Sequence, residues 1–360
     1  LLTANQEGYV VALIQAAGTI VNMVVSIFLI YIGAGVLFVK AVATGVYMLR
    51  LVLVKIYAKR KYPALDFHAE PNEGALKQKN AALLHQVVGI IVNNTDTTVL
   101  TICLGAKSLL EVSVYGIYMM VVNAVNQLMT SFSNGLTAGF GEVIAKNEEE
   151  TLKKSYSSYE YMYFVIMFIV IACMGVLILP FVGVYTINLT DVQYVRPVLG
   201  ILFTVIVFMQ NVRIPGLTII CAAGHYKETR YQAILEAVIN ITVSLGLVWK
   251  FGMAGVLLGT VCSYGYRSFE IVFYTSRHLV KGCAKKSMFR IFRNVLVVAL
   301  LCIVGTYVIP KNMASFITWF LYAIGMVAVS VFTIVGVNYV VEPDEFKELV
   351  LRVKGILRTK

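Results

Sequence analysis

Apolar residues in this chain come in uninterrupted blocks of about twenty, separated by short polar connections. A helix of that length crosses the hydrocarbon core of a bilayer, which is about 30 Å thick. The charged residues amount to 14%, against about a quarter in soluble domains. Because the blocks are continuous and do not alternate, they favour helices over a membrane β-barrel. We therefore expect an all-α polytopic membrane protein of about ten transmembrane helices, at residues 9–32, 36–57, 83–104, 109–134, 159–186, 195–221, 229–249, 254–279, 290–309 and 314–341.

Lysine and arginine are concentrated in every second connection. Five segments hold 21 of them: 58–82, 142–158, 222–230, 276–293 and 342–360. The five intervening connections together hold 3. Since cytoplasmic loops of membrane proteins are enriched in basic residues, we expect the first set to face the cytoplasm. This predicts a multi-pass protein of the cytoplasmic membrane with both ends of the chain on the cytoplasmic side. It also explains the net charge of +11 without a nucleic-acid partner.

Motifs of cofactor and metal chemistry are missing from the sequence. It has no GxxxxGK[ST] loop, no HExxH pair and no CxxC spacing among its six cysteines. We therefore expect no cofactor, no metal site and no enzymatic activity. Without a nucleotide-binding loop, any transport is passive or coupled to an ion. The outer connections are too short to form a domain.

Polar side chains inside the apolar blocks are the best guide to a site, because they rarely face lipid. Asn123, Gln127, Thr130 and Asn134 recur at helical spacing and share one face of a block. A stripe this long either lines a watery cavity or bonds neighbouring helices, and we favour the cavity.

Charged residues occur in several blocks. Arg50 lies about 10 Å and Asp96 about 20 Å from the inner end of their helices. Arg50 either snorkels to the headgroups or faces a cavity. Asp96 serves helix–helix bonding or ion coupling. Arg213 lies two residues before Pro215, which should kink the helix because it lacks a backbone N–H. The kink would leave backbone groups without helical partners beside the Arg213 guanidinium, a group suited to binding phosphate.

Two acidic residues, Glu236 and Glu270, occur in the later blocks, as the arginines do. Glu236 shares a helical face with Asn240, and Arg267 and Glu270 lie in the inner half of the next block. An interhelical ion pair between Glu236 and Arg267 is expected, with a structural role favoured over substrate contact.

Two inner segments have helical patterns of their own. Residues 140–156 are charged and are expected to form a helix on the inner membrane surface. Residues 342–360 alternate apolar and basic side chains at helical spacing, which predicts an amphipathic surface helix. The apolar positions are Phe346, Leu349, Val350, Val353, Ile356 and Leu357.

The chain resembles the Wzx-like polysaccharide transporters of the multidrug/oligosaccharidyl-lipid/polysaccharide exporter superfamily. The resemblance is carried by LLTANQEGYV, KRKYPAL, NNTDTTVLTICLGAKSLLEVSVYGIY, SNGLTAGFGEVIAKNEEE, RIPGLTIICAAGHYKET and EAVIN, in that order over nearly all 360 residues.

The family resemblance implies a MATE-like fold of two six-helix bundles facing a central cavity. Residues 1–62 would be the last two helices of the N-terminal bundle, 83–281 the C-terminal six-helix bundle, 289–341 two extra transmembrane helices and 342–360 a cytoplasmic tail. The chain begins with Leu1 and has no signal-like segment, so we expect an N-terminal part to be missing, and the resemblance implies that this part holds about four helices.

The resemblance also implies export of a polyprenyl-diphosphate-linked glycan across the membrane by alternating access. Arg50, Arg213 and Arg267 would bind the diphosphate, and Asn123 and Gln127 would contact sugar. Asp96 and Glu236 would serve coupling or structure. The expected partners are this glycan, membrane lipids and a coupling ion.

Other functions remain open. A lipid II flippase has nearly the same substrate chemistry, and a drug or cation antiporter of the same superfamily would favour a more acidic cavity. A membrane-embedded glycan polymerase or ligase, and a scaffold for polysaccharide assembly, belong to other classes.

Overall fold

The computed structural model describes residues 8–62, 79–133, 136–310, 313–348 and 350. Within these ranges the regular structure is entirely helical, as the apolar pattern predicted. The elements are α1 (Gly8–Tyr31), α2 (Val36–Lys61), α3 (Lys79–Cys103), the short 3₁₀ helix η1 (Gly105–Lys107), α4 (Ser108–Ser133), α5 (Leu136–Ala145), α6 (Glu149–Tyr185), α7 (Pro197–Val212), α8 (Ile214–Ala222), α9 (Arg230–Phe251), α10 (Met253–His278), α11 (Ala284–Val308) and α12 (Phe316–Val341).

Eight helical stretches in the described ranges are long and apolar enough to cross a membrane. They account for eight of the ten predicted spans. The other two predicted spans are α3 and α10, with 25 and 26 residues, which match the rest in length but not in apolar character. Their buried positions include Asp96 on α3 and Arg267 on α10. Polar helices of this kind need protein neighbours or water around them in a bilayer.

The chain divides into two compact units, Leu1–Ala75 and Leu76–Lys360. The first contains α1 and α2, which pack against each other as a hairpin. Its turn includes Gly33, whose φ of +78° is rarely adopted by residues with a side chain. Inside this unit Arg50 lies across Gly18 of α1, where an added Cβ would meet the Arg50 Cγ at 2.7 Å.

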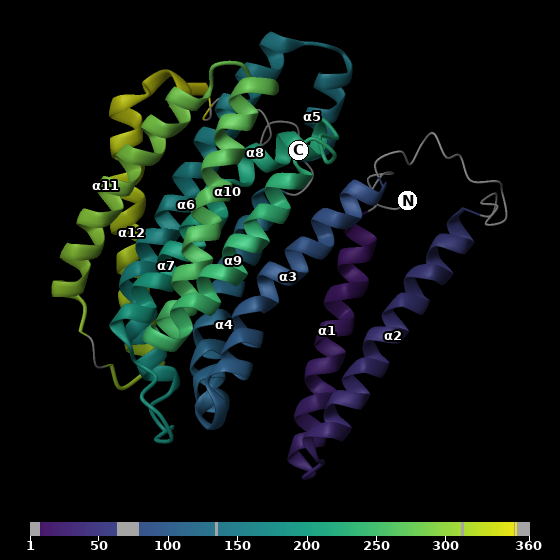
Figure 1. Ribbon diagram of the computed structural model, residues 1–360, viewed down its shortest axis with the longest axis vertical. Coiled ribbons are helices and arrows are strands. Elements are labelled where there is room, and N and C mark those ends of the chain that lie inside the picture. The colour runs from purple at the N-terminus through teal and green to yellow at the C-terminus, as the bar shows by residue number, and fades with distance from the viewer. Residues whose placement is uncertain (1–7, 63–78, 134–135, 311–312, 349, 351–360) are drawn as a thin grey trace. The chain divides into compact units, whose positions relative to one another are not determined.

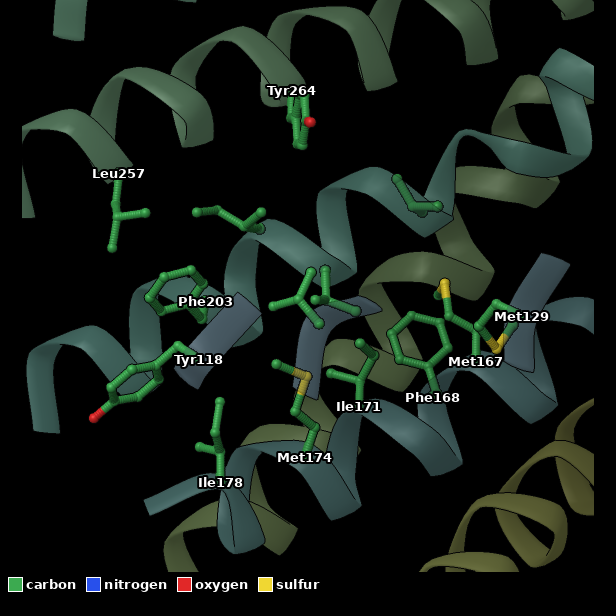
Figure 2. Close-up of a cluster of buried hydrophobic side chains, with 14 of the residues drawn as sticks. Tyr118, Met129, Met167, Phe168, Ile171, Met174, Ile178, Phe203, Leu257 and Tyr264 are labelled. Carbon is green, nitrogen blue, oxygen red and sulfur yellow. The ribbon is translucent and has the colours of Figure 1, made fainter. Parts of the chain in front are cut away.

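The second unit is organised around α6, which packs against α11, α12, α7 and α4 (Figure 1). At 37 residues α6 is about 55 Å long, well beyond the thickness of the hydrocarbon. Figure 2 shows its Met167, Phe168 and Ile171 in the buried core between neighbouring helices. The ring of Phe203 from α7 stacks on that of Tyr118 from α4, with centroids 5.1 Å apart. The two extra helices of the sequence prediction, α11 and α12, thus belong to this same unit.

Connections that are predicted to face opposite sides of the membrane lie at opposite ends of the second unit (Figure 1). The connections α8–α9 and α10–α11, both predicted to be cytoplasmic, share one end. The connections α3–α4, α6–α7 and α9–α10 share the other. The basic connections named here therefore lie at one end of the unit and the others at the opposite end, as the predicted orientation requires.

The predicted inner-surface helix at residues 140–156 is divided between two elements. The α5 helix ends at Ala145, and Asn147 turns the backbone with a φ of +56°. Asparagine tolerates this left-handed conformation better than most residues. The charged second half of the segment, from Glu149 onward, forms the first turns of α6 itself. The helix therefore continues, unbroken, from the polar segment into the span predicted at residues 159–186.

The segment after α12 is anchored by ion pairs. Residues 343–348 are helical, and Phe346 packs edge-on against Tyr339, with ring centroids 5.1 Å apart. Glu345 pairs with Lys286 of α11, and Glu348 lies 2.9 Å from Lys154 of α6. The described start of the predicted amphipathic tail therefore binds the bundle through its acidic side chains. Leu349 and residues 351–360 lie outside the described residues, so the rest of that prediction is untested.

Acid should weaken this anchor. Burial raises the pKa of Glu345, but hydrogen bonds from Lys286 and Ser157 outweigh it and hold the pKa below its usual 4.5. A depressed pKa means that stability is present above pH 4.5 and is lost as pH falls through the lower, folded value. The midpoint temperature of unfolding of the purified protein should therefore decrease once the pH is lowered below about 4.5. In Glu345→Gln this decrease should be smaller. An identical acid profile for the variant would contradict this.

Candidate functional site

A break in one helix positions the first charged group of the site. The α7 helix ends at Val212 and α8 begins at Ile214, with Pro215 in its first turn. Arg213 lies at the joint, as its position before Pro215 predicted. Its guanidinium carbon lies 4.6 Å from the ring centroid of Tyr264 on α10, and its Nη1 donates to Glu236 Oε1 of α9 at 2.5 Å. Stacking and pairing together fix the guanidinium beside the break.

The second arginine approaches the same carboxylate from α10. Arg267 Nε lies 3.6 Å from Glu236 Oε2, which confirms the predicted interhelical pair. Arg267 also donates to Glu270, one turn further along α10. Its side chain is only 3% exposed, and those of Arg213 and Glu236 are 14% and 9% exposed. The group (Arg213, Glu236, Arg267 and Glu270) is therefore a nearly buried network whose formal charges balance.

These charges line a cavity of about 430 Å³. Three of the four network residues border it: Arg213, Glu236 and Arg267. Its walls come from α3, α7, α8, α9, α10 and the α8–α9 connection, and also include His85, Gln86, Asn93, Gln210, Tyr226, Thr229 and Tyr264. Since the α8–α9 connection lies at the end with the predicted cytoplasmic connections, the cavity reaches toward that end (Figure 1).

Neutral polar groups form this end of the cavity. His85 Nε2 lies 3.0 Å from the Tyr226 carbonyl oxygen and 3.3 Å from Thr229 Oγ1. Burial raises the pKa of the Tyr226 phenol to about 12. This phenol is uncharged at neutral pH and offers a hydrogen bond without adding a negative charge.

A second cavity, of about 380 Å³, adjoins the first through shared wall residues. The two have Val92, Asn93, Gln210 and Tyr264 in common. The second also contains Asp96 and Asn123, so a polar tract continues away from the arginines. Figure 2 shows Tyr264 and Phe203, two residues that border the second cavity, on different helices.

Asp96 lies in the wall of the second cavity and joins three helices. Its carboxylate accepts hydrogen bonds from Thr260 of α10 at 2.7 Å and from Tyr115 of α4 at 3.3 Å. Thr260 also accepts from Asn240 of α9 at 3.1 Å, while the Asn240 Oδ1 is buried without a described partner. Among the described residues Asp96 forms no ion pair. The predicted helix–helix bonding is confirmed, and the coupling role stays a prediction.

The remaining predicted residues have different settings. Asn123 is exposed and borders the second cavity. Gln127 and Thr130 are exposed on the same helix but border neither cavity, and Asn134 lies outside the described residues. Arg50 belongs to the other compact unit, where it stacks on Tyr47 at 5.1 Å. The structure thus joins Arg213, Glu236 and Arg267 in one site and Asp96 and Asn123 in the next.

Sequence reasoning missed a ladder of amides between α4 and α7. Asn126 donates to Gln210 at 2.9 Å and accepts from Asn211 at 2.9 Å. Tyr163 of α6 donates to Asn211 at 3.0 Å. Asn126 lies three residues after Asn123, and the pair Gln210–Asn211 directly precedes the helix break. The ladder could have been predicted by including Asn126, three residues after Asn123, in the polar stripe.

A second charged cluster was also missed, at the joint of α6, α11 and the segment after α12. Arg290 is 1% exposed and pairs with Glu160 at 3.0 Å and with Glu342 at 2.9 Å. Arg293 pairs with the same Glu342 at 3.0 Å. The sequence placed both arginines where the basic connection 276–293 overlaps the start of the predicted span 290–309, and charge is ordinary at such an inner end. The pattern carried no sign that these were buried.

The fold and the cavities define the class of this molecule: an all-helical protein with the apolar helices of a multi-pass membrane protein and polar cavities inside its second unit. Neither the protein-family models nor the curated proteins contain a match to the chain.

Proposed function

We propose that this protein exports a polyprenyl-diphosphate-linked oligosaccharide across the cytoplasmic membrane. The observation that carries the proposal is the first cavity, which both Arg213 and Arg267 border, in a bundle whose helices include several of membrane-crossing length. Guanidinium groups bind phosphate oxygens through paired hydrogen bonds. An anionic headgroup entering a bilayer-embedded cavity needs such groups because its own charge is costly there.

The two cavities divide the headgroup between them. Arg213 and Arg267 would hold the diphosphate in the first cavity. Amide side chains there and in the second cavity, such as Asn93, Gln210 and Asn123, offer donors and acceptors to sugar hydroxyls. The prenyl chain would stay in the bilayer. Arg50 remains a proposed contact from the other unit, and Gln127 a proposed contact on the exposed face of α4.

Coupling and alternating access complete the proposal. Asp96 is buried, forms no ion pair among the described residues and links α3, α4 and α10 through hydrogen bonds. A change in its charge, by protonation or by a bound cation, would alter these bonds and bias how the three helices pack. The MATE-like arrangement of two bundles is the framework in which such a bias would open one side or the other.

A cation or drug antiporter is the second candidate, and Asp96 is the observation that favours it. A buried carboxylate without a cationic partner in the described chain is the group that an organic cation would seek. A lipid II flippase differs from the first proposal in the glycan alone. A membrane-embedded glycan polymerase would require an acid–base pair acting on the glycan, whereas Glu236, the acid that borders the first cavity, already pairs with two arginines.

The test is Arg213→Gln in the full-length protein reconstituted in proteoliposomes. Translocation of a fluorescent polyprenyl-diphosphate oligosaccharide should fall at least about tenfold, because one charge-assisted phosphate contact contributes about 1.5–3 kcal/mol. Arg196→Gln is the matched control. It removes another guanidinium paired with a glutamate, at 2.8 Å from Glu111, that borders neither cavity.

The competing functions give other outcomes. Equal translocation by the wild type and Arg213→Gln would sink the proposal. Uptake of organic cations that is lost in Asp96→Asn but kept in Arg213→Gln would establish the antiporter. Selective translocation of a peptidoglycan precursor would indicate the lipid II flippase, and extension of the labelled glycan would indicate a polymerase.

A further inference from the structure

The charges of the first cavity cancel, which limits how it can bind an anion. Arg213 and Arg267 carry two positive charges, and Glu236 and Glu270 carry two negative ones. The Glu236 carboxylate bridges both guanidinium groups, with one oxygen on Arg213 and the other facing Arg267. If the site kept this arrangement, an entering diphosphate would find the Glu236 carboxylate in the position that its own oxygens must take.

Resting on the proposed function, we infer that Glu236 is an internal anion that occupies the two arginines in the empty site and is displaced from them by the diphosphate of the substrate. The exchange replaces one bridging anion by another, so each guanidinium keeps a charged partner throughout. Both states avoid an unpaired buried cation, which is the costly alternative.

Glu236 is the acid suited to this role. It borders the cavity, whereas Glu270 does not. It lies on α9, while its two partners lie on α10 and at the α7–α8 joint, so releasing it breaks contacts between elements. Glu270 pairs with Arg267 of its own helix, one turn away. That local pair can persist while Glu236 moves.

The displaced carboxylate stays at the wall of the same cavity. Gln86 and Asn93 border this cavity as well, and their amide N–H groups are hydrogen-bond donors that a carboxylate accepts. The cavity therefore offers Glu236 polar partners other than the two arginines.

The experiment measures binding of inorganic diphosphate to the full-length protein in nanodiscs by calorimetry. Glu236→Gln should bind diphosphate about tenfold more tightly than the wild type, because the competing anion is gone.

Two further variants separate the explanations. Glu270→Gln makes the same change in net charge and should tighten binding less than Glu236→Gln, whereas equal tightening would show a general charge effect and overturn the inference. Arg213→Gln should abolish binding in every background. If wild type and Glu236→Gln bind diphosphate equally while Arg213→Gln does not bind, the inference fails and the proposed function stands. If Arg213→Gln binds normally, the proposed function fails.

Discussion

Arg290→Ala is expected to lower the free energy of unfolding of this protein by roughly 3–5 kcal/mol, the cost of breaking a buried ion pair. The guanidinium of Arg290 is the centre of the cluster that joins α6, α11 and the segment after α12. It donates to Glu160, to Glu342 and to the Ser157 carbonyl oxygen, at 3.0, 2.9 and 3.1 Å. Its loss leaves the carboxylate of Glu160, itself 3% exposed, without a cation among its described contacts.

Unfolding can be followed by a thiol-reactive dye, because five of the six free cysteines are only partly exposed in the fold. The Arg290→Ala variant should show a much lower midpoint temperature than the wild type. Lys281→Ala is the matched control, since Lys281 pairs with Glu149 at 3.3 Å where both side chains are more than 70% exposed. An exposed pair contributes about 0–1 kcal/mol, so this midpoint should hardly move.

A double substitution distinguishes charge from packing. In Arg290→Met with Glu160→Leu both charges disappear, and apolar side chains of similar size replace them. Such replacements of buried pairs are often neutral or stabilising. The double variant should therefore be more stable than Arg290→Ala. Equal losses in the two would mean that neither the unpaired Glu160 nor the lost volume explains the effect, and that the bonds of Arg290 to Glu342 and Ser157 carry it.

The sequence predicted the parts of this molecule that depend on local pattern. Each of the ten predicted spans corresponds to a helix or helix pair, because runs of apolar residues have no other arrangement that satisfies their backbone in lipid. The helix break at Arg213 followed from Pro215, which lacks a backbone donor. The pair Glu236–Arg267 followed from the rule that buried charges seek partners.

Other features depended on contacts that no local pattern shows. Glu236 bridges two arginines rather than one, because the α7–α8 joint folds against α9. Arg290 is as basic in sequence as its neighbour Lys286, yet Arg290 is 1% exposed while the side chain of Lys286 is 46% exposed. The difference comes from the segment after α12 returning to the bundle, more than 50 residues away.

Packing of α9 on α10 is what holds the arginine site together, and Gly259→Ala should disrupt it. A Cβ at Gly259 would lie 2.7 Å from the backbone nitrogen of Ser244 and 3.0 Å from its Cα. Backbone atoms cannot rotate aside, so the helices must separate. Helices in membranes associate through close approach at small residues rather than through exclusion of water. We expect a loss of about 1–3 kcal/mol, read as a lower unfolding midpoint.

Gly265→Ala on the same helix isolates the steric cause. No atom lies within 4 Å of a Cβ placed there, so this change should stabilise the helix by about 0.5–1 kcal/mol. Gly259 also directly precedes Thr260, whose hydroxyl donates to Asp96, and it shares α10 with Arg267. Separation of α9 from α10 should therefore weaken diphosphate binding in Gly259→Ala, while Gly265→Ala binds as the wild type does. If both variants were equally stable and bound diphosphate equally well, close approach at Gly259 would not be what aligns Glu236 with the arginines.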